Sequence, residues 1–379
     1  MRLMNTPRSV DLSITNRCNL RCRYCAHFDS ADDVGRDLPT QEWLQFFREL
    51  GACAVMDVCL CGGEPFLRED FHELIHGIVR NRMRFSILSN GTLITRELAD
   101  FLRDTGRCNS IQVSIDGSSP ATHDAGRGQG NFYRAMDGLK TLLEQGLCPS
   151  VRVTIHKHNV HDLEEVARLL LEELGLPAFS TNAASYMGLC RQNAESLQLD
   201  PQERFLAMET LLRLNQQYQN RIQANAGPLA EAHQWTHMEA ARRDQLEALP
   251  GRGALLSCGG VFEKMAVRAD GVMVPCNQLA HIELGRVNRD PLREVWQRHP
   301  ELQRMRERRQ IPLSDFPFCQ GCPYLPYCPG GCPALAYSLL GKENHPSPDS
   351  CLWRYLQAGG RLPDERGLSN NPAASPECP

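Results

Sequence analysis

The sequence predicts an α/β protein built around a parallel β-sheet, and two observations support this fold class. Short apolar segments that are typical of strands recur along the first half of the chain, at residues 9–14, 55–60, 85–88, 111–115, 151–155 and 178–181. Amphipathic segments that are typical of helices separate them, at residues 41–50, 71–80, 96–103, 133–145 and 162–174. Six consecutive βα units favour a parallel sheet with right-handed crossovers, whose functional residues lie at the carboxyl ends of the strands.

Capping residues set the expected limits of these helices. Thr40, Thr95 and Asp162 stand where a side-chain oxygen can accept hydrogen bonds from the first turn of a helix. Glycines that suit helix C-caps follow four of the segments, at Gly51, Gly106, Gly146 and Gly175.

The second half of the chain changes character twice, which predicts the domain organisation. Residues 191–257 show helical periodicity at 201–220 and 228–249, so we expect a helical connector of two or three helices after an α/β domain at 1–190. Residues 258–356 are rich in cysteine, proline and glycine and form a third expected region. Residues 357–379 contain little that could be buried, and we expect a disordered tail there.

Composition narrows the functional class. The 379 residues carry a net charge of -4, so we expect no nucleic-acid or anionic-membrane partner. No apolar run of about 18 residues is present, and residues 1–8 lack the apolar core of a signal peptide. Seventeen cysteines without a secretory signal are typical of metal ligands rather than of a disulfide framework, so we expect a reducing cytoplasm.

The most informative motif is Cys18-x3-Cys22-x2-Cys25, which directly follows the first predicted strand. Three thiolates are one short of the four ligands that a closed cluster or a structural zinc site normally has. A metal centre held in this way keeps an open position for chemistry. A zinc knuckle is the alternative, but a fourth nearby ligand is missing.

Further polar groups follow other strands. Gly62-Gly63-Glu64-Pro65 comes after the second strand and supplies a carboxylate that can pair with an ammonium group. Ser114-Ile115-Asp116-Gly117 ends the fourth strand, and Arg127 offers a fork for a carboxylate. An amino acid attached to a nucleoside would satisfy the open metal position and all of these groups.

With these motifs the chain resembles the radical S-adenosylmethionine (radical SAM) superfamily from about residue 8 to residue 182. The matching residues are Cys18-x3-Cys22-x-Tyr24-Cys25, Gly62-Gly63-Glu64-Pro65, Ser89-Asn90-Gly91 and Ser114-Ile115-Asp116-Gly117. The resemblance implies a partial (β/α)6 TIM-like barrel. It also implies a [4Fe-4S] cluster whose iron without a cysteine is chelated by S-adenosylmethionine. Reductive cleavage then releases a 5'-deoxyadenosyl radical that abstracts hydrogen from the substrate.

The resemblance also implies roles for individual residues. Gly62, Gly63 and Glu64 would hold the amine of S-adenosylmethionine, and Arg127 would hold its carboxylate. Tyr24 would meet the adenine edge, while Ser114 and Asp116 would lie near the ribose or the carboxylate. Asn90 would either contact the cofactor or serve the turn with Gly91. No catalytic base is identified.

Seven further cysteines follow in the last third of the chain, at Cys258, Cys276, Cys319, Cys322, Cys328, Cys332 and Cys351. Their pattern resembles the SPASM extension of some radical SAM enzymes, and the alternative is one or two zinc ribbons. The resemblance implies two auxiliary [4Fe-4S] clusters. Cys319, Cys322, Cys328 and Cys351 would hold the outer cluster, and Cys258, Cys276 and Cys332 would hold the inner cluster, nearer the barrel mouth.

Two departures from the SPASM pattern affect the expected chemistry. Residues 259–274 contain no cysteine, so the inner cluster is expected to have an open iron or a ligand such as Glu263, Cys190 or the substrate. Asn277 stands where anaerobic sulfatase-maturing enzymes have an aspartate proposed as the base, and an amide cannot take that proton. A sulfatase-maturase function is therefore disfavoured.

Enzymes with both regions mostly modify peptides or proteins, so the expected substrate is a ribosomally made precursor peptide or a protein. We expect an oxidative crosslink, namely a thioether, C–C or C–O bond, with flavodoxin or ferredoxin as the electron donor. Peptide epimerisation, dehydrogenation of a small alcohol or sugar, and an electron-transfer iron–sulfur protein are the alternatives. The pocket expected around Glu64, Arg127 and Ser114 disfavours a pure electron carrier.

Recognition of a leader peptide is a separate question. The first strand begins by about Ser9, so we expect no N-terminal peptide-recognition domain, and a separate leader-recognition protein is one expected partner. A run of four arginines could contact an acidic leader, but a solvated helix face is the favoured interpretation. These residues are Arg304, Arg306, Arg308 and Arg309.

Overall fold

The computed structural model describes residues 3–29, 36–256 and 258–364. Within these residues, no helix is both long and apolar enough to cross a membrane.

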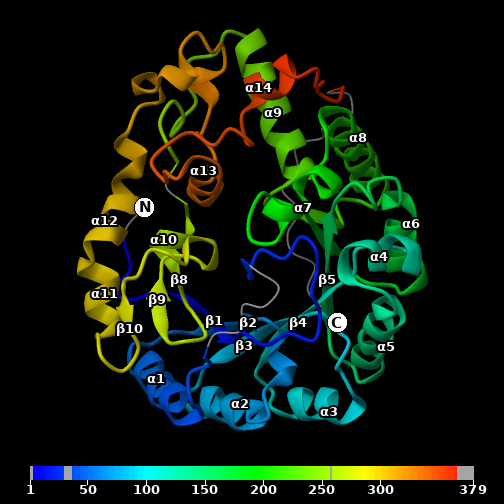
Figure 1. Ribbon diagram of the computed structural model, residues 1–379, viewed down its shortest axis with the longest axis vertical. Coiled ribbons are helices and arrows are strands. Elements are labelled where there is room, and N and C mark those ends of the chain that lie inside the picture. The colour runs from blue at the N-terminus through cyan, green and yellow to red at the C-terminus, as the bar shows by residue number, and fades with distance from the viewer. Residues whose placement is uncertain (1–2, 30–35, 257, 365–379) are drawn as a thin grey trace.

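A single ten-stranded sheet runs through the molecule in the order β10-β9-β8-β1-β2-β3-β4-β5-β6-β7 (Figure 1). All neighbours from β8 to β7 are parallel, whereas β8–β9 and β9–β10 are antiparallel. The strands are β1 (Ser9–Thr15), β2 (Asp57–Gly62), β3 (Arg84–Ser89), β4 (Cys108–Ser114), β5 (Pro149–Ile155), β6 (Phe179–Ala183), β7 (Ile222–Ala224), β8 (Lys264–Val267), β9 (Val272–Val274) and β10 (Gly285–Arg286). The predicted α/β class with a parallel sheet is confirmed.

Helices cover the outer side of β1 to β6 (Figure 1). These are α1 (Thr40–Ala52), α2 (Phe71–Arg80), α3 (Arg96–Asp104), α4 (Pro120–Arg127), α5 (Asn131–Glu144) and α6 (Leu163–Arg168), the last continued by a π-helical turn (Leu169–Glu173). The later α-helices are α7 (Cys190–Leu197), α8 (Pro201–Gln217), α9 (Pro228–Arg243), α10 (Gly260–Glu263), α11 (Leu292–Arg298), α12 (Pro300–Glu307), α13 (Pro333–Leu340) and α14 (Leu352–Gln357). Short 3-10 helices occupy Pro65–Leu67, Asn277–Leu279, Arg308–Gln310, Leu313–Asp315, Pro317–Cys319 and Leu325–Tyr327.

The strands divide their side chains between two faces, as the period of two requires. On β1, Val10, Leu12 and Ile14 are fully buried in the main core together with α1 and α2. The alternate residues Asp11 and Ser13 therefore point to the opposite, inner side of the sheet. This alternation places polar side chains inside the partial barrel and leaves the apolar face for the helices.

The region predicted to be a helical connector contains a strand as well as helices, because β7 lies within it. β7 pairs with β6 in parallel and extends the barrel sheet to a seventh strand on that side. At the other edge, β8 of the cysteine-rich region pairs in parallel with β1. Segments from all three expected regions therefore contribute to one sheet, which fixes the cysteine-rich region against the barrel.

The expectation of a disordered tail from residue 357 is corrected for its first part. The amide of Gly360 donates to the carbonyl of Tyr355 (3.0 Å), and the amide of Arg361 donates to the Tyr355 hydroxyl (3.2 Å). The Arg361 guanidinium lies 4.7 Å from the centre of the Phe205 ring. Gly360 and Arg361 are therefore held in place by contacts with Tyr355 and Phe205, and residues 365–379 of the predicted tail lie outside the described residues.

Only part of the four-arginine run is solvated: Arg309 is exposed, whereas two of the arginines are buried. Arg306 and Arg308 are buried, at 8% and 1% exposure. Arg308 donates to three backbone carbonyls, and the guanidinium of Arg306 lies 4.6 Å from the centre of the Trp296 ring. Arg304 pairs with Glu301 (2.6 Å). These contacts hold loops of the cysteine-rich region together, so the favoured interpretation from the sequence was wrong for Arg306 and Arg308.

Candidate active site

The Cys18, Cys22 and Cys25 loop leaves the carboxyl end of β1 and is anchored by Asp37. This carboxylate accepts hydrogen bonds from Thr15 Oγ1 (2.6 Å) and from the amide of Asn16 (2.8 Å).

Burial raises the pKa of the Cys18 and Cys22 thiols, and the neighbouring thiols of the motif raise both pKa values further. Burial is the larger cause and raises the pKa of the Cys22 thiol to about 12. The amide of Leu20 points at Cys18 Sγ (3.4 Å), which is the kind of hydrogen bond that supports a metal-bound thiolate.

The backbone of Gly62-Gly63-Glu64 packs closely against the cysteine loop. The amide of Gly63 donates to the carbonyl of Thr15, and the amide of Glu64 donates to the carbonyl of Arg17, both at 2.8 Å. A Cβ added at Gly63 would lie 2.6 Å from the Arg17 carbonyl carbon and 3.2 Å from Cys18 Cβ. Glycine is thus needed for close packing against the loop. The predicted contact of Gly62 and Gly63 with an amine stays a prediction.

Glu64 is a buried carboxylate that is held in place by hydrogen bonds from its neighbours. It accepts from Ser89 Oγ (3.0 Å) and from the amides of Asn90 (2.8 Å) and Phe66 (3.3 Å). Burial raises the pKa of Glu64 to about 7, although these hydrogen bonds act in the opposite direction. An ammonium group beside Glu64 would stabilise its ionised form, so this carboxylate fits the predicted amine.

Asn90 serves the turn after β3. Its Oδ1 accepts from the amide (2.9 Å) and hydroxyl (2.7 Å) of Thr92, and its Nδ2 donates to Asn19 in the cysteine loop (2.9 Å). The turn role is therefore present, and a cofactor contact of Asn90 stays a prediction.

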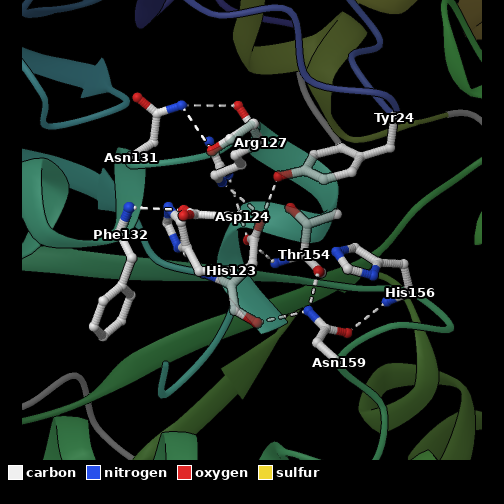
Figure 2. Close-up of polar contacts among 11 residues, drawn as sticks. Tyr24, His123, Asp124, Arg127, Asn131, Phe132, Thr154, His156 and Asn159 are labelled. Atoms are coloured by element: carbon white, nitrogen blue, oxygen red, sulfur yellow. Dashed lines mark hydrogen bonds and ion pairs between the residues drawn. The ribbon is translucent and has the colours of Figure 1, made fainter. Parts of the chain in front are cut away.

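Arg127 and Asp116 form a buried ion pair, and Figure 2 labels Arg127 together with Tyr24, Thr154 and Asn159, which also form hydrogen bonds with Asp116. Arg127 Nε lies 2.6 Å from Asp116 Oδ2, and Nη2 lies 3.3 Å from Oδ1. The guanidinium holds the pKa of Asp116 below its usual range, against the effect of burial. The ion pair shows that the two groups bind each other, and the predicted contacts of Arg127 with a ligand carboxylate and of Asp116 near the ribose or carboxylate stay predictions.

Tyr24 joins the same network. Its hydroxyl donates to Asp116, and its ring lies 5.5 Å from that of His156, centre to centre (Figure 2). A Cβ added at Gly126 would lie 2.7 Å from Tyr24 Cε1 and 2.8 Å from His156 Nε2, so the ring fits only over glycine. The Tyr24 hydroxyl therefore points at Asp116, and the predicted contact of Tyr24 with the adenine edge stays a prediction.

Two other members of this network were not among the predicted site residues. His123 Nδ1 accepts from the amide of Asp116 (3.1 Å), and Asn159 Nδ2 donates to the carbonyls of Asp116 (2.7 Å) and Thr154 (2.9 Å). Local spacing could not reveal Asn159, because it lies 43 residues from Asp116 in the sequence. Ser114 is half-buried at the carboxyl end of β4, and its predicted cofactor contact stays a prediction.

The later cysteines include two sets of neighbouring thiols, one around Cys276 and one around Cys319. Burial raises the pKa of Cys276, and the nearby thiols of Cys258 and Cys332 raise it further. Burial also raises the pKa of Cys319, with a further contribution from the thiols of Cys322, Cys328 and Cys351. Amides two residues on point at three of the sulfur atoms, at 3.4 Å for Cys258, 3.5 Å for Cys276 and 3.3 Å for Cys328.

The donor chemistry fits iron–sulfur clusters, in which each thiolate binds a different iron. Within the described residues, no three His, Cys, Asp or Glu side chains converge on one point as ligands of a single metal ion would. The assignment of individual cysteines to clusters stays a prediction.

Asn277 connects the two cysteine-bearing regions. Its Nδ2 donates to Cys61 Sγ (3.5 Å) on β2, and its Oδ1 accepts from Ser13 Oγ (3.4 Å) on β1. Asn277 directly follows Cys276 in the chain. The residue that replaces a proposed base therefore fastens the inner cysteine group to the barrel strands.

A cavity of about 400 Å³ lies between the barrel mouth and the inner cysteines. Ala183 and Asn225, at the carboxyl ends of β6 and β7, line one side, and Cys258 and Cys332 line the other. Cys190 and Glu263, the suggested additional ligands, are not among the lining residues: Cys190 is buried beside Ala184 and Leu197, and Glu263 is exposed.

Comparison with known proteins identifies the family. Residues 12–170 match the radical SAM superfamily, and residues 258–323 match an iron–sulfur cluster-binding domain, SPASM. An AdoMet-dependent heme synthase of Methanosarcina barkeri is 26% identical over 93% of this chain and 98% of its own. The PqqA peptide cyclase of Ruegeria pomeroyi is 26% identical over 88% and 84%.

Solved structures share the fold. Streptococcus suis SuiB bound to its precursor peptide SuiA has a TM-score of 0.69 at 16% identity, covering 92% of this chain and 77% of SuiB. The anSMEcpe protein with bound AdoMet has a TM-score of 0.67 at 17% identity, covering 93% and 95%. A radical SAM [4Fe-4S] cluster, S-adenosylmethionine and iron–sulfur binding in the SPASM domain follow from the family. The chain is a member of the radical SAM superfamily that carries a SPASM domain, and it is a radical SAM/SPASM enzyme.

Proposed function

We propose that this enzyme abstracts hydrogen from a ribosomally made peptide or a protein and forms an oxidative crosslink in it. The observation that carries the proposal is the cavity between the carboxyl ends of β6 and β7 and the inner cysteines. A substrate held there lies between the barrel, where S-adenosylmethionine is expected, and Cys258 and Cys332. Crosslinking removes one electron more than hydrogen abstraction does, so a redox centre on the far side of the cavity suits it.

The lining of the cavity suits a peptide. Gln198, Asn225 and Gln234 contribute side-chain amides, which can both donate to and accept from a peptide backbone. A volume of about 400 Å³ holds a short segment of chain rather than a folded domain.

Within the proposal, the chain's own residues hold and orient the cofactors. S-adenosylmethionine bound to a [4Fe-4S] cluster supplies a 5'-deoxyadenosyl radical. Cys18, Cys22 and Cys25 would hold that cluster, and Glu64 would accept hydrogen bonds from the amine. The buried Asp116–Arg127 pair fixes the loops around the site. Two auxiliary clusters held by the later cysteines complete the proposed set.

Heme synthesis is a second candidate, because the Methanosarcina barkeri heme synthase matches almost end to end. An iron porphyrin with carboxylate side chains would need cationic partners. Among the described residues lining the cavity, Arg204 is the one cation, and it already pairs with Glu231 (2.7 Å from Nε to Oε2). The electrostatics of the cavity therefore favour a peptide.

The test is anaerobic incubation of the reconstituted enzyme with S-adenosylmethionine and dithionite, which replaces a donor such as flavodoxin or ferredoxin. Two substrates are compared: the peptide encoded by a short reading frame beside the gene, and Fe-coproporphyrin III. We expect 5'-deoxyadenosine and a peptide about two hydrogens lighter. An unchanged mass with an inverted residue would indicate epimerisation, and turnover of the porphyrin alone would refute the proposal. A Cys18→Ala variant is the matched control for radical formation.

A further inference from the structure

The cavity beside Cys258 and Cys332 carries more negative than positive charge. Arg204, Glu231 and Asp349 are the charged side chains among its described lining residues. Arg204 forms a two-pronged pair with Glu231, and its Nη2 donates to the backbone carbonyl of Asp349 (2.9 Å). Its guanidinium also lies 4.9 Å from the centre of the Trp235 ring. The one cation is thus fixed and largely satisfied by Glu231.

The carboxylate of Asp349 is less well partnered. Its nearest charged neighbour is Arg204 Nη1, at 3.6 Å from Oδ1, which is beyond hydrogen-bonding distance. No donor within the described residues makes a hydrogen bond to this carboxylate, and a third of the side chain is exposed (33%). Arg204 cannot neutralise both Glu231 and Asp349, so one negative charge remains at the cavity.

We propose that Asp349 is the counter-ion for a basic side chain of the peptide substrate, lysine or arginine, which enters this cavity beside the modified residue. The inference rests on the proposed peptide function. An ammonium or guanidinium group can donate directly to the free carboxylate oxygens. Thiolates of an inner cluster at Cys258 and Cys332 would add negative charge to the same space. A glutamate or aspartate at that peptide position would meet repulsion.

The amide side chains complete the recognition. Gln198, Asn225 and Gln234 line the same cavity and can satisfy the backbone on either side of the basic residue. Asp349 then determines which side chain is accepted, while the amides hold the chain irrespective of its sequence. Specificity by charge comes from a loss of affinity for the wrong partner as well as a gain for the right one.

The test is binding of four acetylated, amidated dodecapeptides of glycine and alanine with a neutral fluorophore. Three differ only at the central residue, which is lysine, glutamine or glutamate, and the fourth has the glutamine centre with a free α-amine. Fluorescence anisotropy is measured anaerobically on the reconstituted enzyme. We expect the lysine peptide to bind about ten-fold more tightly than the glutamine peptide. Equal gains from the free α-amine would overturn the assignment to a side chain.

Substitutions of Asp349 test whether this residue causes the preference for the lysine peptide. Asp349→Asn should abolish the preference for lysine, and Asp349→Lys should transfer it to the glutamate peptide. Asp315→Asn is the matched control, because Asp315 is exposed and is not among the residues that line the cavity. Iron content and melting temperature equal to wild type show that each variant is folded. Equal binding of all charges by wild type refutes the inference and leaves the peptide function standing, whereas no binding of any peptide counts against both.

Discussion

Gly63 gives the sharpest test of how the cysteine loop is built. In Gly63→Ala the new methyl group would lie 2.6 Å from the Arg17 carbonyl carbon and 3.2 Å from Cys18 Cβ. The obstacle is backbone rather than the end of a flexible side chain, so the loop must move. Such a movement breaks two hydrogen bonds of 2.8 Å, from the amides of Gly63 and Glu64 to β1 and its loop.

The free-energy cost of Gly63→Ala can be estimated from these contacts. Overpacking of a tight site costs about 1 to 3 kcal/mol, and each lost hydrogen bond costs about 0.5 to 1.5 kcal/mol. Together, these effects should destabilise the segment that carries Cys18 by about 2 to 6 kcal/mol. We therefore expect Gly63→Ala to lower the melting temperature and to lose about four irons per chain, the content of one cluster.

The assay is iron analysis after anaerobic reconstitution, together with the change that S-adenosylmethionine causes in the electron paramagnetic resonance spectrum of the reduced protein. Gly106→Ala is the control: its φ of +59° also disfavours alanine, but an added Cβ would meet no atom within 4 Å. It should be mildly destabilised and keep its iron. A Gly63→Ala protein with full iron content and an unchanged spectral response would refute the reasoning.

Three further predictions concern other contacts. Arg127→Met leaves the Asp116 carboxylate buried without its partner, and a loss of about 3 to 5 kcal/mol should lower the melting temperature; adding Asp116→Asn should restore part of it. Burial lowers the pKa of His156 to about 4 from 6.5, so its contribution to stability is present above pH 6.5 and is lost as the pH falls toward 4. That loss is about 2 kcal/mol by pH 5, and His156→Gln should flatten the fall in melting temperature between pH 7 and 5; an unchanged slope would contradict this. Asn277→Asp replaces the donor to Cys61 with an anion beside Cys276, so a cluster there should become harder to reduce; a potentiometric titration checks this against Asn277→Ala, and equal potentials would contradict it.

Local sequence patterns were sufficient for much of the fold. The predicted segment 71–80 coincides with α2, and each of the six predicted strands overlaps an observed one, because apolar periodicity and glycine caps are short-range signals. β7 was missed because three residues in polar surroundings carry no alternation that could be recognised. Its strand conformation comes from pairing with β6, which is a long-range contact.

The sequence alone identified the closely spaced cysteines that are predicted to bind clusters, and it predicted that the first three follow a strand. It could do so because the spacing of thiols in a ligand-bearing loop is a local property of the sequence. Only the tertiary structure decided how charges are paired. Arg127 lies 11 residues from Asp116, and their pairing follows from the burial of both side chains at one place in the fold. Asp349 is only weakly paired with Arg204, at 3.6 Å, because Glu231, 118 residues earlier in the sequence, already binds that guanidinium. Charge pairing depends on distance and burial in space, and neither quantity is encoded by the local pattern of residues.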